Sequence, residues 1–122
     1  MTKRILVVED QEDNRQILRD LLGSVGYEMM EAWDGAAGVA AAREQRPDLI
    51  LMDIQMPQMD GYEATRRIKA EPDLKSIPII VVTSYALSGD ESKARAAGCD
   101  AYVTKPYSPK QLLAKIKEFL PQ

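Results

Sequence analysis

Five polar residues that together could accept a phosphoryl group each follow a short, mainly apolar run of this 122-residue sequence. They are Glu9, Asp10, Asp53, Thr83 and Lys105. Three carboxylates that meet in one site repel one another unless a cation lies among them, and Mg²⁺ prefers such oxygen ligands. With the metal bound, one carboxylate can attack phosphorus and form an aspartyl phosphate, while an ammonium and a hydroxyl stabilise the phosphoryl oxygens. The set predicts an Mg²⁺-dependent phosphoacceptor site, provided that the fold brings these residues together.

The apolar runs are themselves typical of buried strands. Residues 5–8, 49–52 and 79–82 are purely apolar, too short for helices, and without the alternation of a strand that has one wet face. This combination predicts central strands of a parallel sheet that is covered on both faces. Residues 27–32 and 101–104 are weaker candidates, and they suit the edges of the sheet.

Helical patterns fill the gaps between these runs. Apolar residues three or four positions apart predict buried faces for the first and the last helix, and these are Ile17, Leu18, Leu21, Leu22 and Val25, and then Leu112, Leu113, Ile116, Phe119 and Leu120. Capping residues mark the starts of the other helices and of the last one, namely Asp34, Asp60, Ser88 with Glu91, and Ser108 with Gln111. The corresponding ends are predicted at Gly26, before Pro47, near Ala70 and near Gly98.

Strand and helix alternate five times with short connections, which predicts an α/β fold. Such alternation implies parallel strands, right-handed crossovers and helices on both faces of the sheet. Sites in these doubly wound sheets form at the carboxyl ends of the strands, near the point where the strand order reverses. If the order is 2-1-3-4-5, the first and third strands are neighbours, and Glu9, Asp10 and Asp53 converge on one edge. Asp53 ends the central strand and is the predicted nucleophile, with Thr83 and Lys105 on its other side.

Each of these residues alone has a simpler interpretation. An acidic residue after a strand, such as Glu9 or Asp10, is often only a helix cap, and Asp53 could form a hydrogen-bonded turn. Thr83 alone is typical of a β-branched strand end, and Lys105 alone is typical of a solvated lysine. Their joint placement, each at the carboxyl end of its own strand, favours the site.

The composition predicts one cytoplasmic domain, residues 1–122, with no output domain. Apolar residues make up 45% and charged residues 29% of the chain, which is typical of globular proteins. A formal net charge of −3, without a cluster of Lys and Arg, argues against a nucleic-acid surface. No stretch approaches the roughly 20 apolar residues of a membrane span, and the apolar run after the basic start is too short for a signal peptide.

Two residue counts narrow the chemistry further. A single cysteine, Cys99, cannot form an internal disulfide, which fits a reducing compartment. The chain contains no histidine, so a histidine base, a histidine metal ligand or a phosphohistidine within this chain is excluded. A phosphohistidine donor would therefore lie outside this sequence.

The motifs around these residues resemble the receiver domain of two-component response regulators. The resemblance covers the whole chain, and the stretches that carry it are residues 5–10, 48–57, 60–61, 82–84 and 104–106. The sequence is most similar to single-domain bacterial regulators related to cell-division control, through residues 83–86, 89–91 and 98–102. The resemblance implies a flavodoxin-like (βα)5 three-layer sandwich and a signalling protein that catalyses only its own phosphoryl transfer and dephosphorylation.

The resemblance also implies a metal site and a phosphoacceptor. Asp53 would accept the phosphoryl group from the phosphohistidine of a histidine kinase or a histidine phosphotransfer protein. Mg²⁺ would be bound by Asp10, by Asp53 and by the main-chain carbonyl of Gln55, with Glu9 binding through water.

A conformational switch is implied as well. The hydroxyl of Thr83 and the ammonium of Lys105 would reach the phosphoryl group, and a cis bond between Lys105 and Pro106 would aim the lysine inward. Thr83 would move inward on phosphorylation and Tyr102 would turn into the vacated space. The fourth helix, fifth strand and fifth helix would then form the face for a downstream protein target. A monomer that binds neither nucleic acid nor membrane is expected.

Three other functions fit parts of the pattern. A haloacid-dehalogenase-type phosphatase needs a second carboxylate two residues after the nucleophile, where this sequence has Gln55, and a cap domain. A flavodoxin needs a phosphate loop of Ser, Thr or Gly after the first strand, where Glu9 and Asp10 would repel a flavin phosphate. A docking module that works without phosphorylation is the strongest rival, and Mg²⁺-dependent labelling with acetyl phosphate would separate it from a phosphorylated switch.

Overall fold

The computed structural model describes residues 2–56, 58–83 and 90–120. Strands and helices alternate along these segments as the sequence predicts. They are β1 (Arg4–Val8), α1 (Glu12–Ser24), β2 (Glu28–Ala32), α2 (Gly35–Gln45), β3 (Leu49–Asp53), α3 (Gly61–Lys69), β4 (Ile79–Thr83), α4 (Asp90–Ala97), β5 (Ala101–Thr104) and α5 (Pro109–Phe119). No helix in these three segments is both long and apolar enough to cross a membrane.

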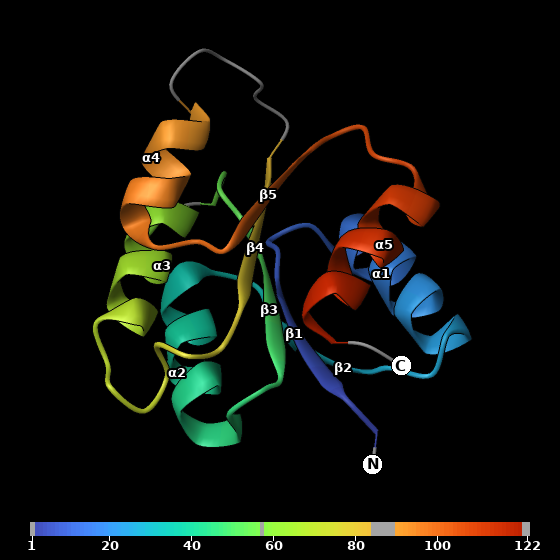
Figure 1. The fold of residues 1–122 in the computed structure, drawn as a ribbon, viewed down its shortest axis with the longest axis horizontal. Coiled ribbons are helices and arrows are strands. Elements are labelled where there is room, and N and C mark those ends of the chain that lie inside the picture. Colours follow the sequence, from blue (N-terminus) through green and yellow to red (C-terminus); the bar gives the residue numbers. More distant parts are fainter. Residues whose placement is uncertain (1, 57, 84–89, 121–122) are drawn as a thin grey trace.

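All neighbouring strands of the sheet run parallel, and their order is β2-β1-β3-β4-β5. The predicted fold class and strand order are confirmed. Figure 1 shows α2, α3 and α4 on one face of the sheet and α1 and α5 on the other. The strand order reverses between β1 and β3, and Val8 pairs with Met52 at their carboxyl ends. The residues that follow Val8 therefore lie beside Asp53, the last residue of β3.

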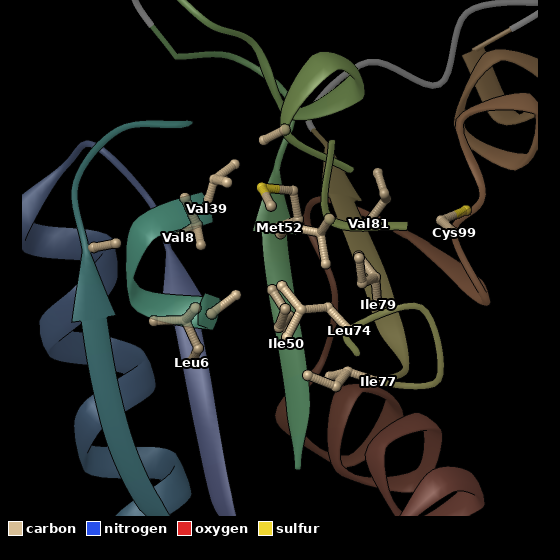
Figure 2. Packing of buried hydrophobic residues seen from close by; sticks show 14 of the residues in the cluster. Leu6, Val8, Val39, Ile50, Met52, Leu74, Ile77, Ile79, Val81 and Cys99 are labelled. Atoms are coloured by element: carbon tan, nitrogen blue, oxygen red, sulfur yellow. The ribbon is translucent and has the colours of Figure 1, made fainter. Parts of the chain in front are cut away.

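The two faces of the sheet carry separate apolar clusters, because successive side chains of a strand point to opposite faces. On the face of α2, α3 and α4 lie Leu6, Val8, Ile50, Met52, Ile79 and Val81, which Figure 2 shows with Val39, Leu74, Ile77 and Cys99. On the face of α1 and α5 lie Ile5, Val7, Leu49, Leu51, Ile80 and Val82. The central strands are buried on both sides, which explains their unbroken apolar runs.

Local capping bonds start three of the helices at the predicted residues. The Asp34 carboxylate accepts from the Ala37 amide at 2.7 Å, and the Asp60 carboxylate accepts from the Glu63 amide at 2.9 Å. Ser108 and Gln111 form the predicted reciprocal capping box at the start of α5. The predicted cap at Ser88 lies outside the described residues.

The predicted buried face of α1 is wrong at one residue. Leu18 and Leu22 are buried as expected, but Ile17 is 60% exposed. Ile17 instead borders an apolar cavity of about 370 Å³ that α1 shares with the start of α5. The buried face of α1 is therefore narrower than its apolar residues suggest, because α1 and α5 do not cover the side chain of Ile17.

Candidate functional site

Three carboxylates converge at the carboxyl ends of β1 and β3. Glu9 and Asp10 directly follow β1, and Asp53 ends β3, because these strands are neighbours in the sheet. One oxygen of each of the three carboxylates lies within 4.8 Å of the others. Glu9 is 3% and Asp53 7% exposed, so water screens their repulsion poorly.

Glu9 is held by donors on both carboxylate oxygens. The Gln11 amide donates to Oε2 at 3.1 Å, while the Asn14 side-chain amide and the Lys105 ammonium donate to Oε1 at 3.2 and 3.1 Å. Burial of Glu9 raises its pKa, but the Gln11 hydrogen bond, the charge of Lys105 and side-chain hydrogen bonds with Asp10 and Lys105 together outweigh burial and hold the pKa below its usual value. The partners of Glu9 therefore favour its ionised form.

The carboxylate of Asp53 has fewer and longer contacts with hydrogen-bond donors than that of Glu9. Lys105 Nζ lies 3.9 Å from Asp53 Oδ1, and the Gln55 amide reaches the same oxygen only at 3.4 Å. Burial, and then the charge of Glu9, raise the pKa of Asp53 to about 7. The pKa of Asp10 is also raised, first by burial and then by its hydrogen bond with Glu9.

The donor set suits a hard divalent cation. Three carboxylates surround the position, and one ammonium, that of Lys105, forms ion pairs with Glu9 and Asp53 there. The pKa values of Asp10 and Asp53 are raised, first by burial and then by the neighbouring Glu9, so their ionised forms are disfavoured in the pocket. A cation with oxygen ligands, such as Mg²⁺, would favour these ionised forms.

Thr83 and Tyr102 lie on the side of the site away from β1. Thr83 ends β4 and is 1% exposed, and its carbonyl accepts from the Lys105 amide at 2.7 Å. Tyr102 on β5 pairs with Val81 and packs, half-buried, against the core under α2, α3 and α4. Val81 and Thr83 are two residues apart in β4, so their side chains point to the same face of the sheet. Tyr102 pairs with Val81 and therefore lies on that face too. The peptide bond between Lys105 and Pro106 is cis, as the resemblance implies.

Two residues of α1 complete the site and were not predicted from the sequence. The Asn14 side chain bonds the Glu9 carboxylate, and Arg15 Nη1 donates to the main-chain oxygen of Glu9 at 2.7 Å. The Arg15 side chain is only 11% exposed, pairs with Glu12 and Glu31, and lies 6.0 Å from the ring centre of Trp33. The only signal in the sequence is that both residues fall in the first turn of the helix that follows the acidic pair.

Gly61 lies in one of the stretches that carry the resemblance, but its contact with the site was not predicted. It opens α3, and its amide donates to the Ile54 carbonyl at 3.0 Å. A Cβ at this position would overlap the main-chain oxygen of Asp53 and lie 2.9 Å from Ile54 Cα. The start of α3 is thus packed directly against the segment that carries Asp53.

A comparison with family models shows which family the chain belongs to. The model for the response regulator receiver domain matches residues 5–117. The chain is a response regulator receiver domain. The resemblance to regulators related to cell-division control is also confirmed, since this receiver domain is 44% identical over 120 residues to the polar-differentiation response regulator DivK of Brucella ovis. The match covers 98% of both chains, and DivK of Brucella anthropi matches equally well.

Solved structures agree with this assignment. The receiver domain of the sensor histidine kinase PA1611 from Pseudomonas aeruginosa PAO1 has a TM-score of 0.92 and 36% sequence identity, and all of both chains is covered. That structure has a magnesium ion coordinated in its active site cleft. The Vibrio cholerae chemotaxis protein CheY4 has a TM-score of 0.92 and 28% identity, with 98% of this chain and 99% of that chain covered.

Membership of this family places the receiver domain in two-component signalling. Response regulator receiver domains interact with histidine kinases or histidine phosphotransfer proteins, so the predicted class of partner is confirmed at this level. The acidic pocket of Glu9, Asp10 and Asp53 corresponds to a metal site that the family is expected to have.

Proposed function

We propose that this receiver domain is a monomeric, cytoplasmic, single-domain regulator, residues 1–122, that accepts a phosphoryl group on Asp53. The donor is the phosphohistidine of a histidine kinase or a histidine phosphotransfer protein. The observation that carries the proposal is the convergence of Glu9, Asp10 and Asp53 within 4.8 Å beside Lys105. These 122 residues contain no histidine, so the donor imidazole lies outside them.

Asp10, Asp53 and the main-chain carbonyl of Gln55 would hold Mg²⁺, and Glu9 would bind it through water. The bound metal supplies positive charge that favours ionised Asp53 and neutralises phosphoryl oxygens. This help matters because the pKa of Asp53 is raised to about 7 without it. An ionised Asp53 is required, since the carboxylate is the nucleophile and its protonated form is not.

The transfer is an in-line displacement at phosphorus. A carboxylate oxygen of Asp53 forms the new bond to phosphorus as the bond from phosphorus to the donor imidazole nitrogen breaks. The electron pair stays on that nitrogen, which then takes a proton from water. The Lys105 ammonium, 3.9 Å from Asp53 Oδ1, and the Thr83 hydroxyl stabilise the charge on the phosphoryl oxygens. Hydrolysis of the aspartyl phosphate by water returns the domain to its starting state. The domain catalyses only these two reactions, its own phosphorylation and its own dephosphorylation.

The output is a change of protein-binding surface. Thr83 ends β4 under the site, and Tyr102 lies on the same face of the sheet one strand away. Thr83 moves toward the phosphoryl group and Tyr102 turns inward behind it, which remodels the face formed by α4, β5 and α5. A downstream protein target binds this face, and neither nucleic acid nor a membrane is involved.

The proposal is tested by labelling with acetyl phosphate and Mg²⁺, followed by intact-mass measurement. The wild type should gain one phosphoryl group, and Asp53→Asn should gain none. Asp60→Asn is the matched control, because Asp60 caps α3 on the surface and asparagine can replace it as a cap. Undiminished labelling of Asp53→Asn would assign the nucleophile to another residue. A wild type that takes up nothing would favour a docking module that works without phosphorylation.

A further inference from the structure

The side-chain amide of Asn14 and the ammonium of Lys105 share one oxygen of Glu9. Asn14 Nδ2 lies 3.2 Å and Lys105 Nζ 3.1 Å from Glu9 Oε1. The other oxygen, Oε2, accepts from the Gln11 amide. Among the described residues, Lys105 alone forms an ion pair with Glu9. Glu9 is 3% exposed and lines the cavity that α1 shares with the start of α5, so its carboxylate depends mainly on protein donors, and the loss of one weakens its hold.

Lys105 must serve two sites in turn if the proposed function holds. Its ammonium bonds Glu9 in this structure, yet it is the group that would stabilise the phosphoryl oxygens on Asp53. When it moves, Glu9 loses its only ionic partner within the described part of the chain. The Gln11 amide lies in the turn that follows Glu9, and Asn14 lies in the first turn of α1. Both therefore remain bonded to Glu9 when Lys105 leaves.

We propose that Asn14 is a positioning residue: its amide keeps the buried Glu9 carboxylate bonded and in place, and so allows Lys105 to be released toward the phosphoryl group. This inference rests on the proposed function. The arrangement is supported from the same helix turn, because Arg15 Nη1 fixes the main-chain oxygen of Glu9 at 2.7 Å. Main chain and carboxylate of Glu9 are thus both held by α1. Without the amide of Asn14, Lys105 would be the remaining one of the two donors that bond Oε1 here, and release of the lysine would remove both of these protein donors from a buried carboxylate oxygen.

Asn14→Leu tests this role, since leucine matches asparagine in size and favours helix but cannot donate to Glu9. Gln16→Leu is the matched control. Gln16 is an amide on the same helix, but it is exposed and bonds only with Asp20 and Arg19 among the described residues. Two readouts are needed. One is the rate of acetyl phosphate labelling at saturating Mg²⁺, and the other is the NMR order parameter of the Lys105 side chain in metal-free protein.

Asn14→Leu should label about tenfold more slowly, which is the effect of one hydrogen bond to a charged group. In metal-free protein its Lys105 side chain should become more ordered, because Glu9 Oε1 then has no competing donor. Gln16→Leu should match the wild type in both readouts. A packing role for Asn14 predicts no change in Lys105, since leucine fills the same space. Either a labelling rate equal to that of the wild type or an unchanged order of Lys105 in Asn14→Leu would overturn the proposal.

Failure of the proposed function is distinguishable from failure of this inference. If the wild type takes up no phosphoryl group, the order parameter of Lys105 in metal-free protein still shows whether Asn14 competes for Glu9. If the wild type is labelled and Asn14→Leu is labelled equally fast, the proposed function stands and the role of Asn14 is rejected.

Discussion

Two buried carboxylates at one end of the sheet have opposite environments. Glu9 accepts three hydrogen bonds from Gln11, Asn14 and Lys105, and its pKa is lowered. Asp53 has a long contact with the Gln55 amide and a more distant lysine, and its pKa is raised to about 7. The residue with the weaker set of partners is the one that the chemistry needs. A carboxylate that is fully bonded within the protein would be a poor nucleophile and a poor metal ligand.

The raised pKa of Asp53 predicts how stability depends on pH in metal-free protein. The folded carboxyl binds its proton more tightly than the unfolded one, whose pKa is near 3.8, so its contribution to stability is lost as the pH rises from about 4 to about 7. Asp53→Asn carries no such charge. In EDTA at pH 8 it should melt about 4 °C or more above the wild type.

The difference between the two melting temperatures should shrink at pH 5, where Asp53 of the wild type is protonated. Thermal melts recorded by circular dichroism at both pH values would measure it. Saturating Mg²⁺ at pH 8 should raise the melting temperature of the wild type more than that of Asp53→Asn. A wild type as stable as Asp53→Asn in EDTA at pH 8 would contradict the raised pKa.

At the scale of residues, the sequence predicts which polar residues form the candidate site but not the hydrogen bonds among them. Glu9, Asp10, Asp53 and Lys105 could be placed because each follows a strand, and parallel strands end at one edge of the sheet. Asn14 could not, since its contact with Glu9 depends on how α1 is rotated against β1. Helix rotation is set by packing of the whole buried face, which a short motif does not contain.

At the scale of elements, the start of α3 is fitted against the end of β3. Gly61 approaches Asp53 and Ile54 so closely that a single methyl group would overlap main-chain atoms. The Gly61 amide also bonds the Ile54 carbonyl. The position of Asp53 is therefore fixed by the start of α3 as well as by β3.

Gly61→Ala should accordingly lower the free energy of unfolding by about 3 kcal/mol, because the methyl group displaces the main chain after Asp53. Gly23→Ala is the control, since Gly23 is an exposed helix residue and a Cβ there meets nothing within 4 Å. It should raise the free energy of unfolding by about 0.5 to 1 kcal/mol. Urea denaturation would measure both. If Gly61→Ala were as stable as the wild type, the close packing of α3 on β3 would be wrong.

Local signals predict these elements better than they predict packing. The caps at Asp34, Asp60 and Ser108 are confirmed because each bond closes within three residues. The apolar stripe of α1 fails at Ile17 because its exposure depends on α5, which lies far away in the sequence. Periodicity shows which residues can be buried, and the arrangement of neighbouring helices decides which of them are.

At the scale of the whole molecule, the site is connected to a distant surface through one face of the sheet. Thr83 at the end of β4 and Tyr102 on β5 share the face that is covered by α2, α3 and α4. Asp53 lies at the end of the neighbouring strand, where Val82 pairs with it. A movement of Thr83 toward Asp53 would open space on the side of Tyr102. The proposed switch therefore requires no rearrangement of the sheet itself.

Beryllofluoride with Mg²⁺, which mimics the aspartyl phosphate, should shift amide signals in two regions of the wild type. One surrounds Asp53, and the other covers α4, β5 and the first turns of α5. Residues 86–89, which the sequence includes in the same face, lie outside the described residues. Thr83→Ala should keep the shifts around Asp53, because the carboxylates and Lys105 remain, but it should lose most of the distant ones. Nuclear magnetic resonance of labelled protein would record both sets.

Thr104→Ala is the matched control for this experiment, because Thr104 pairs with Thr83 in the sheet but has an exposed side chain. It should keep both sets of shifts. The switch needs only a few kcal/mol of differential interaction between its two states, which hydrogen bonds from Thr83 and Lys105 to a phosphoryl group can supply. If Thr83→Ala retained every shift in α4, β5 and α5, the coupling from hydroxyl to tyrosine would be wrong. The phosphoacceptor role of Asp53 would be unaffected, and the signal would have to reach that face through Lys105 and the segment between β5 and α5.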